Sequence, residues 1–268
     1  MKVGVIGCGV VGETVAQWLE KRWHSVARHD PPKGMLDSLD ECEAAFICVP
    51  TDFDGNQSDM SIVYEAASCL RGRKNVIVKS TVLPGTTCFL QKTYPQHTFF
   101  FIPEFLSEDS AATDYAAPLV SMVGVTVWDR LDSFQRQLAT AQVQRLRDDN
   151  LIGRHYRTIV QSTVAEFYKL MRNAYLATKV IFFNEMYDLC TRDKIDFGVI
   201  RDLARADPWI GGEHTDPTHK GYRGYGGKCF PKDVSAILAY ARERGVDLEL
   251  LSAAQQVNVV RYQYASLA

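Results

Sequence analysis

Hydrophobic residues in the first half of the chain gather in short runs that are separated by longer amphipathic stretches. The runs predict buried strands at 2–6, 24–28, 44–49, 75–79, 97–101 and 119–125. Apolar residues at helical spacing predict helices between them, among them 13–23, 59–70 and 126–142. Strands that alternate with helices in this way form βαβ units. The pattern therefore predicts a doubly wound α/β domain with a parallel sheet.

The pattern changes after about residue 160. Residues 162–192 contain no proline or glycine and carry an apolar stripe at helical spacing, which predicts one long helix. Thr163 and Glu166 have the spacing of a capping box, so we expect this helix to begin near Ser162 or Thr163.

Two further helices are expected near the end of the sequence, at 231–244 and 248–265, after a glycine-rich segment at 207–227. No internal repeat or flexible linker separates the halves. We therefore expect an α/β domain over 1–160 and an all-helical domain over 161–268.

Composition narrows the class of protein. The 268 residues are 46% hydrophobic and 23% charged, as in folded globular proteins. Thirty basic and thirty-two acidic residues leave a formal charge of -2, which gives no drive toward nucleic acid or anionic lipid. No apolar stretch has membrane-spanning length and the sequence opens directly on a strand, so we expect a cytoplasmic protein. Seven cysteines without a C-x-x-C pair indicate reduced thiols and no metal site.

A glycine-rich turn at residues 7–12 connects the first strand to the first helix. Its G-x-G-x-x-G spacing allows close approach of the backbone to a pyrophosphate that faces the helix amino terminus. Asp30, at the end of the next strand, can accept both ribose hydroxyls and favours NAD, and Arg28 and His29 weaken that preference without reversing it. The alternative is a turn used only for packing. The NAD contacts expected in the turn are Gly7, Gly9, Val10, Val11 and Gly12.

The segment 224–233 combines three glycines with two lysines, a cysteine and a proline. Pro231 suits the first turn of a helix, which places Cys229 just before the helix amino terminus. The helix dipole and the nearby Lys228 and Lys232 would lower the pKa of such a thiol and make it a nucleophile. The alternative is a small buried hydrophobic residue, which is the usual role of a cysteine.

Other candidate residues lie on the long helix and on two loops. Lys169 and Asn173 are four residues apart and share one helix face, where a cation and an amide can stabilise an oxyanion. A solvated helix face is the alternative. Thr81, a hydroxyl donor, and Glu104 and Glu108, candidate bases, follow strands at their carboxyl ends, where doubly wound sheets bind ligands. Each is otherwise an ordinary loop residue.

Taken together, five motifs resemble the UDP-glucose/GDP-mannose dehydrogenase family, in family order and over nearly the whole chain. They are G-x-G-x-x-G from Gly7, K-S-T-V-x-P-G-T from Lys79, P-E-F-L-x-E from Pro103, A-E-x-x-K-x-x-x-N-A-x-L-A-x-K from Ala165 and G-Y-G-G-x-C-F-P-K-D from Gly224. The resemblance implies a Rossmann-like NAD-binding domain followed by a helical central domain. It also implies a homodimer formed through the long helix.

The resemblance further implies two successive oxidations of a sugar C6 alcohol, to an aldehyde and then to a carboxylate, each with one NAD. Cys229 would form a thiohemiacetal and then a thioester, while Lys169 and Asn173 would stabilise the oxyanions. UDP-glucose is the expected nucleotide sugar.

The family motifs assign the remaining roles. Asp233 and Thr81 would position a water molecule, and Glu104, assisted by Glu108, would promote thioester hydrolysis. Further NAD contacts would come from Pro50, Thr51, Ser80, Thr81 and Lys232. Substrate contacts would come from Phe105, Leu106, Lys169, Asn173, Lys220, Arg223, Tyr225, Gly226 and Gly227.

The sequence departs from the family in three places. Full-length members carry a third, nucleotide-binding domain, and this sequence ends where the central helices would lead into it. The segment between Asp30 and Phe46 is compressed. The family's R-I-G motif is replaced by Trp209-Ile-Gly211, and an indole cannot make the bidentate contacts of arginine, so recognition would depend on Arg223 or Lys220.

Two alternatives to UDP-glucose oxidation stay open. The same chemistry would serve another sugar nucleotide or a sugar without a nucleotide. A degenerate dinucleotide-binding protein without turnover is the second alternative. The joint presence of Cys229, Lys169, Asn173 and Asp233 argues against it, because a binding module does not need a nucleophile and an oxyanion clamp.

Overall fold

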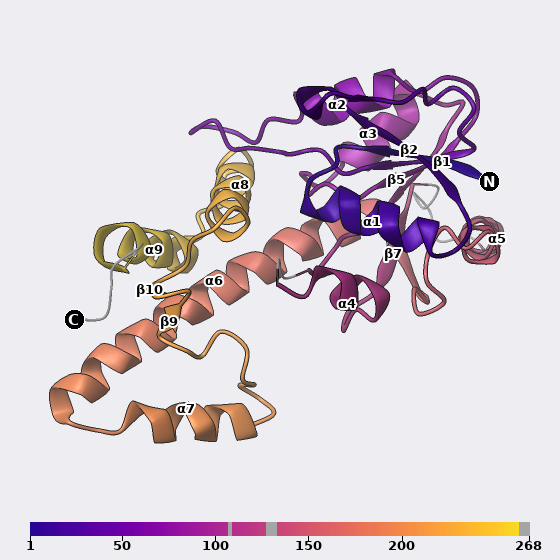
Figure 1. Cartoon of the computed structure of the whole chain (residues 1–268). Helices are drawn as coiled ribbons and strands as arrows, with labels where there is room; N and C mark the ends of the chain where they lie inside the picture. Colours follow the sequence, from indigo (N-terminus) through magenta and orange to yellow (C-terminus); the bar gives the residue numbers. More distant parts are fainter. Residues whose placement is uncertain (107–108, 127–132, 263–268) are drawn as a thin grey trace. The chain divides into compact units, whose positions relative to one another are not determined.

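The computed structural model describes residues 1–106, 109–126 and 133–262, and the chain divides into two compact units (Figure 1). Unit 1 comprises Met1–Asp52 and Ser58–Lys169, and unit 2 comprises Phe53–Gln57 and Leu170–Ala268. The division between the units falls inside the long helix.

Unit 1 is built on one sheet with the strand order β3-β2-β1-β4-β5-β6-β7-β8 among the described residues. The strands are β1 (Lys2–Ile6), β2 (Ser25–Asp30), β3 (Met35–Leu36), β4 (Ala44–Ile47), β5 (Asn75–Val78), β6 (Thr98–Phe101), β7 (Met122–Val125) and β8 (Thr158–Gln161). The five strands β2, β1, β4, β5 and β6 are parallel, as expected.

The two edges of the sheet depart from that expectation. β3 is antiparallel to β2, because the four residues between them are too few for a crossover connection. β7 is antiparallel to β6, and β8, which the hydrophobic pattern did not predict, is parallel to β7. The α/β fold is confirmed as a mixed sheet rather than a wholly parallel one.

Helices cover both faces of this sheet. On one face lie α1 (Val10–Glu20), α4 (Ala111–Ala116) and α5 (Ser133–Asp148), and on the other lie α2 (Ser61–Ser68) and α3 (Thr86–Thr93) (Figure 1). Of the expected helix at 126–142, residues 127–132 lie outside the described residues. α3 and α4 are short and escaped the hydrophobic pattern.

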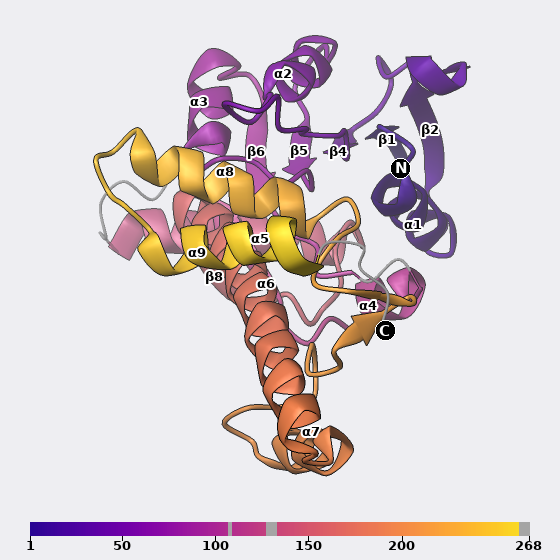
Figure 2. The same cartoon turned by 90° about the vertical axis from the view of Figure 1, so that its left-hand side faces the viewer.

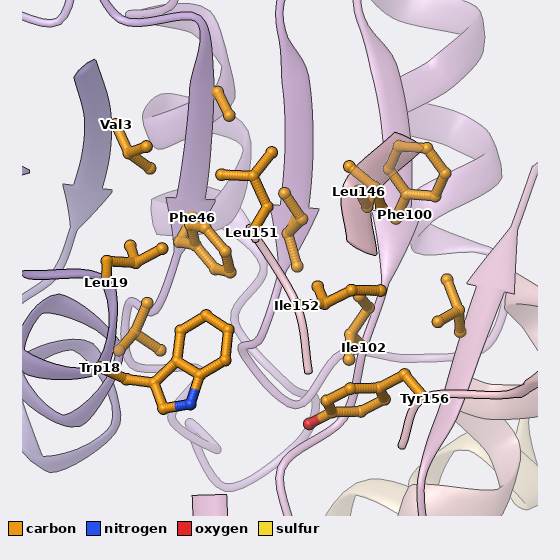
Figure 3. Packing of buried hydrophobic residues seen from close by; sticks show 14 of the residues in the cluster. Val3, Trp18, Leu19, Phe46, Phe100, Ile102, Leu146, Leu151, Ile152 and Tyr156 are labelled. Carbon is orange, nitrogen blue, oxygen red and sulfur yellow. The ribbon is translucent and has the colours of Figure 1, made fainter. Parts of the chain in front are cut away.

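The apolar side chains of unit 1 alternate between these two layers. Phe46 packs on the α1 face with Trp18 and Ile102, as Figure 3 shows, whereas Ile47 packs on the α2 face. Burying one such side chain contributes about 1.5–3 kcal/mol relative to leaving it exposed. Because β4 and β5 are buried on both faces, they form the centre of the unit and fix the position of the loops that follow them.

Unit 2 is helical, with one short ribbon. α6 (Ser162–Asp193) begins in unit 1 and continues through unit 2, where it is followed by α7 (Phe197–Ala206), α8 (Phe230–Arg242) and α9 (Glu249–Val257). α8 and α9 lie side by side in Figure 2. A π-helical turn, Asn258–Tyr262, extends α9. The long helix begins at Ser162, as predicted.

The ribbon was not expected in the glycine-rich segment. β9 (Thr218–His219) pairs antiparallel with β10 (Tyr222–Arg223). The two residues between them, Lys220 and Gly221, have φ values of 50° and 85°, which suits the two central residues of a tight hairpin turn.

All seven cysteines are reduced thiols in the structure. Cys69 and Cys229 are exposed, and the other five are buried or half-buried. Within the described parts of the chain, every helix is too short or too polar to cross a bilayer.

Candidate active site

The turn between β1 and α1 requires its glycines. Gly7 has a φ of 83°, and a Cβ there would lie 2.7 Å from the carbonyl oxygen of Cys48. A Cβ at Gly12 would lie 1.9 Å from the carbonyl oxygen of Gly7, so neither position admits a side chain. Gly9, which precedes α1, has no neighbouring atom within 4 Å of its Cβ position. The backbone at Gly9 is therefore open to a ligand.

Asp30 reaches from the end of β2 to this turn. Its Oδ2 accepts a hydrogen bond from the Cys8 N–H at 2.8 Å, and Lys33 donates to the Cys8 carbonyl oxygen at 2.7 Å. Val10 and Val11 form the first turn of α1, where backbone N–H groups have no helical acceptors. A carboxylate beside a helix amino terminus fits the ribose and the phosphates of NAD.

Arg28 is directed away from this carboxylate. Its guanidinium group is 3.2 Å from Glu13 and 2.7 Å from Glu20, both on α1. These hydrogen bonds raise the pKa of Arg28, and the one with Glu13 holds the pKa of that carboxyl below its ordinary value. The ring of His29 contacts the Asp37 carbonyl oxygen at 3.3 Å. The two basic residues that weakened the preference for NAD in the sequence thus have other contacts.

The loops after β4 and β5 are joined at the same edge of the sheet. β1, β4 and β5 are parallel neighbours, so the loops that follow them open on one side. The Thr51 hydroxyl donates to the Thr81 carbonyl oxygen at 2.7 Å, and the Ser80 hydroxyl donates to the Val49 carbonyl oxygen at 2.7 Å. Unit 1 therefore brings together the residues expected to contact NAD: Pro50, Thr51, Ser80 and Thr81.

Glu104 and Lys169 form a buried ion pair in unit 1. Nζ of Lys169 is 3.0 Å from Oε1 of Glu104 and donates to the Glu104 carbonyl oxygen at 2.6 Å. The two side chains are 6% and 12% exposed. Phe105 packs edge-on against Tyr168, and Nζ of Lys169 lies 5.2 Å from the centroid of the Phe105 ring. Lys169 is therefore not part of a solvated helix face.

The loop that contains Glu104 continues past Phe105. Leu106 is half-buried and packs against the core on the α1 face. Glu108, the expected partner of Glu104 in hydrolysis, lies outside the described residues.

Glu166 has a role that the capping-box interpretation did not find. Its two carboxylate oxygens accept hydrogen bonds from the N–H groups of Gly85, at 2.6 Å, and Thr87, at 2.8 Å. The carboxylate therefore caps α3 and not its own helix. Burial raises the pKa of Glu166, and these hydrogen bonds oppose the shift. The acid at this spacing was visible in the sequence, but its partner, about eighty residues earlier, was not.

Asp233 organises the polar residues of unit 2. Its side chain is 1% exposed and lies in the first turn of α8. Oδ2 accepts a hydrogen bond from Nδ2 of Asn173 at 2.6 Å, and Oδ1 is paired with Nζ of Lys232 at 2.7 Å. Lys232 thus contacts the buried carboxylate. Its predicted contact with NAD and its predicted effect on the thiol stay predictions.

Cys229 lies at the expected place. It is the exposed residue immediately before α8, and Pro231 occupies the first turn of that helix. The N–H of Asp233 donates to the Cys229 carbonyl oxygen at 2.9 Å, so the thiol and the buried carboxylate are one helical turn apart.

Arg223 is engaged within unit 2. Its guanidinium group is 2.6 Å from Asp188 Oδ1 and donates to the side-chain and backbone oxygens of Asn184 at 3.0 and 2.9 Å. It also stacks on Tyr187 and Tyr262, with 5.1 and 4.6 Å to the ring centroids. These contacts give Arg223 a structural role, because each guanidinium nitrogen already has an acceptor. Lys220 is exposed in the hairpin turn.

Asn258 was missed by the sequence analysis. Its side chain accepts a hydrogen bond from the Tyr225 N–H at 2.8 Å and donates to the Tyr225 carbonyl oxygen at 2.9 Å. A Cβ at Gly224 would lie 2.4 Å from the same side chain. Asn258 therefore fixes the start of the glycine-rich loop that leads through Gly226 and Gly227 to Cys229. Burial raises the pKa of Tyr225 to about 12.

Both parts of the chain match known protein domains. Residues 33–136 match the NAD binding domain of the UDP-glucose/GDP-mannose dehydrogenase family, and residues 163–259 match the central domain of the same family.

Individual relatives extend the match over nearly the whole chain. The Bacillus subtilis protein YtcA is 30% identical over 308 residues, which include 96% of this chain and 67% of YtcA. The UDP-glucose 6-dehydrogenase of Streptococcus pneumoniae is 31% identical over 258 residues, with 94% of this chain and 62% of that protein covered. A UDP-glucose dehydrogenase structure from Pyrobaculum islandicum superposes with a TM-score of 0.79 at 24% identity, covering 96% of this chain and 68% of that one. The chain thus spans about two thirds of the length of these relatives.

Proposed function

The chain belongs to the UDP-glucose/GDP-mannose dehydrogenase family, and from this premise we propose that it oxidises the C6 alcohol of a nucleotide sugar to the carboxylate, with UDP-glucose as the substrate. NAD, when bound, accepts one hydride in each of the two oxidations. The open backbone at Gly9, the first turn of α1 and the Asp30 carboxylate would hold it.

Unit 2 would supply the nucleophile. The Cys229 thiolate would add to the aldehyde carbon to give a thiohemiacetal, and loss of hydride from that carbon would leave a thioester. Water would then add to the thioester carbonyl, the carbon–sulfur bond would break, and the carboxylate product and the thiolate would separate. The oxyanion formed at each addition needs positively polarised donors.

The remaining residues have roles that suit this sequence. Lys169 and Asn173, one turn apart on α6, would stabilise the oxyanions. Glu104 would accept the proton of the attacking water, with Glu108 assisting. Asp233 and Thr81 would position that water.

Contacts to the sugar would come from residues that neighbour Glu104 and Cys229 in the sequence. Phe105 and Leu106 follow Glu104, and Lys220, Tyr225, Gly226 and Gly227 precede Cys229. Nucleotide contacts would come from Lys220 and Arg223, and Arg223 is already held by Asn184 and Asp188.

One observation carries the proposal. Asn173, on α6, is bonded to a carboxylate one helical turn from an exposed cysteine at the amino terminus of α8. A buried Asp–Asn pair one helical turn from an exposed thiol has parts that covalent aldehyde oxidation needs. A protein that only bound NAD would have no use for them.

A panel of sugar nucleotides tests the substrate class. UDP-glucose, UDP-N-acetylhexosamines and GDP-mannose, each supplied with NAD, are assayed by NADH absorbance. The expected result is two NADH per molecule of UDP-glucose, with the uronate identified by mass spectrometry. NADH binding without turnover on the whole panel would instead support a degenerate binding protein.

A pair of cysteine variants tests the nucleophile. Cys229→Ser is expected to slow acid formation by about 10³-fold or more, because serine lacks thiolate nucleophilicity. Cys69→Ser removes the other exposed thiol and serves as the control, with activity unchanged. Equal acid formation by Cys229→Ser and the parent would refute the covalent mechanism.

We also propose a homodimer formed through the long helix. Large apolar side chains are exposed on α6 at spacings of four and seven residues: Phe167, Met171, Tyr175, Phe182 and Leu189. A stripe of this kind is typical of a helix that packs on a partner. Sedimentation should give twice the chain mass, and a Phe182→Glu and Leu189→Glu double variant should give the chain mass. A monomeric parent would refute the dimer.

A further inference from the structure

Lys79, the residue after β5, is a buried cation that has no hydrogen-bond acceptor in the described part of the chain. It is 1% exposed, and its Nζ has no partner among the described residues. Nζ lies 5.0 Å from the centroid of the Tyr115 ring and 5.8 Å from that of Tyr156. Aromatic faces stabilise a cation, but they do not accept its three N–H groups as oxygen atoms do. A polar group left in this state indicates a bound water or a functional role.

Glu104 supplies a complementary atom. Its Oε1 is paired with Lys169, whereas its Oε2 is buried and has no hydrogen-bond partner within residues 1–106, 109–126 and 133–262. Lys79 and Glu104 follow the neighbouring parallel strands β5 and β6, so both lie at the carboxyl edge of the same sheet. Burial lowers the pKa of Lys79 to about 8, and the charge of Glu104 acts in the opposite direction. The two groups therefore interact within one low-dielectric region.

The other groups that the structure describes near Lys79 do not provide a second anion at neutral pH. Burial raises the pKa of the Cys48 thiol and of the Tyr115 and Tyr156 hydroxyls, and it lowers the pKa of His155, so these groups are neutral. Lys169 is a second cation. Among the described groups that face Lys79, Glu104 is the anion, and it is shared with Lys169. These described groups are Cys48, Glu104, Tyr115, His155, Tyr156 and Lys169.

We propose that Lys79 is a positioning residue for the hydrolytic half of the reaction, in which its ammonium group and Oε2 of Glu104 together hold a buried water molecule. Two buried polar atoms without partners are the usual site of such a water. With Oε1 fixed by Lys169 and Oε2 fixed through the water by Lys79, the carboxylate has one orientation. The inference rests on the proposed function and extends it.

The consequence concerns one step. When water adds to the thioester carbon, its proton passes to Glu104, the carbon–sulfur bond breaks and the Cys229 thiolate leaves. Removal of Lys79 leaves Oε2 and its water without their second anchor, so the carboxylate loses the single orientation in which it accepts that proton. Hydride transfer from the alcohol does not use Glu104 and is left intact.

Transient kinetics of Lys79→Met tests this role. We expect hydrolysis to slow by about 10-fold or more, the lower range of lost acid–base catalysis, with the first hydride transfer unchanged. Intact mass spectrometry should show the acyl adduct accumulating on Cys229. Lys79→Gln, which keeps a donor for the water, should recover part of the rate. A Lys79→Met protein with unchanged hydrolysis, or with both steps slowed equally, would overturn the proposal.

Lys74→Met is the matched control. Lys74 precedes β5 and is 3% exposed, and its Nζ donates to the carbonyl oxygens of Asp40 and Cys42. It is therefore as buried as Lys79 but fully engaged in structure. Its replacement should leave the ratio of the two steps unchanged, and a changed ratio would show that the effect of Lys79→Met is one of stability.

A measurement without substrate separates this inference from the proposed function. In the intact protein labelled with [13C]lysine, the Lys79 signal, assigned by its loss in Lys79→Met, should titrate near pH 8. Glu104→Gln should move that midpoint to lower pH, because the opposing charge is lost. An unchanged midpoint would refute the pairing. If the titration moves but no sugar nucleotide is oxidised, the proposed function fails while the Lys79–Glu104 site stands.

Discussion

Two lysines at opposite ends of β5 are both buried, and they differ in the hydrogen bonds that their ammonium groups make. At the amino end, the ammonium group of Lys74 bonds to two backbone carbonyl oxygens. At the carboxyl end, the ammonium group of Lys79 bonds to no oxygen of the described chain. The hydrogen bonds of Lys74 thus stabilise the fold at the amino end of β5. The charge of Lys79 at the carboxyl end has no such bonds in the described chain, and folding alone does not need it. Ligands of doubly wound sheets bind at the carboxyl end.

The strongest test of this contrast is Glu104→Gln at the carboxyl end. The amide keeps the shape of the side chain but cannot accept a proton, so thioester hydrolysis should fall by about 10²–10⁴-fold. Rapid-quench analysis should show an acyl-enzyme that forms and persists. An unchanged rate of hydrolysis in this variant would show that Glu104 takes no part in the reaction. It would also contradict the hypothesis that the carboxyl end of the sheet is the functional end.

The next test measures stability against pH at Lys79. Its pKa is about 8 in the folded chain and 10.5 in the unfolded chain, so the unfolded chain binds more protons between these values. The contribution of Lys79 to stability therefore rises with pH across this window, by about 3 kcal/mol. Lys79→Met should reduce the increase of stability with pH. At pH 7 the variant should unfold at a higher denaturant concentration than the parent. A lower midpoint at pH 7 would show that the buried charge stabilises the fold.

The smallest effect is expected at the amino end. Lys74→Met leaves two buried carbonyl oxygens without their donor, which should lower the free energy of unfolding by about 1–3 kcal/mol. Denaturant titration at pH 7 measures it beside Lys79→Met. The two substitutions are chemically identical, but they should change the free energy of unfolding at pH 7 in opposite directions. Changes in the same direction would contradict the distinction between the two ends of the strand.

Much of unit 1 could be predicted because its determinants are local. The spacing of the glycines in the turn after β1 predicts a dinucleotide-binding turn. The strand before the turn and the strands at 44–47 and 75–78 are almost wholly apolar. α3 and α4 have eight and six residues, which is about one or two turns and too short for a helical periodicity to be recognised. β3 and the β9–β10 ribbon have two residues per strand, which is below the length at which alternation can be recognised.

The candidate site could be predicted where residue type alone limits the role. A cysteine before a helix and an acid one turn later were visible as Cys229 and Asp233. The hydrogen-bond partners of Arg223 could not be predicted, because its acceptors on α6 are nearly forty residues away in the sequence. Nor could the burial of Lys79 be predicted, since lysine is commonly exposed and the two rings beneath it come from positions 115 and 156.

The distribution of thiols gives the molecule a practical property. Since Cys69 and Cys229 are the exposed thiols and the other five are buried or half-buried, a Cys69→Ser protein would present Cys229 as its one exposed thiol to maleimide or iodoacetamide reagents. A fluorophore or spin label could then be attached beside α8 without rebuilding the sequence. Protection of that site by added sugar nucleotide would report occupancy directly, even under conditions in which no turnover is measured.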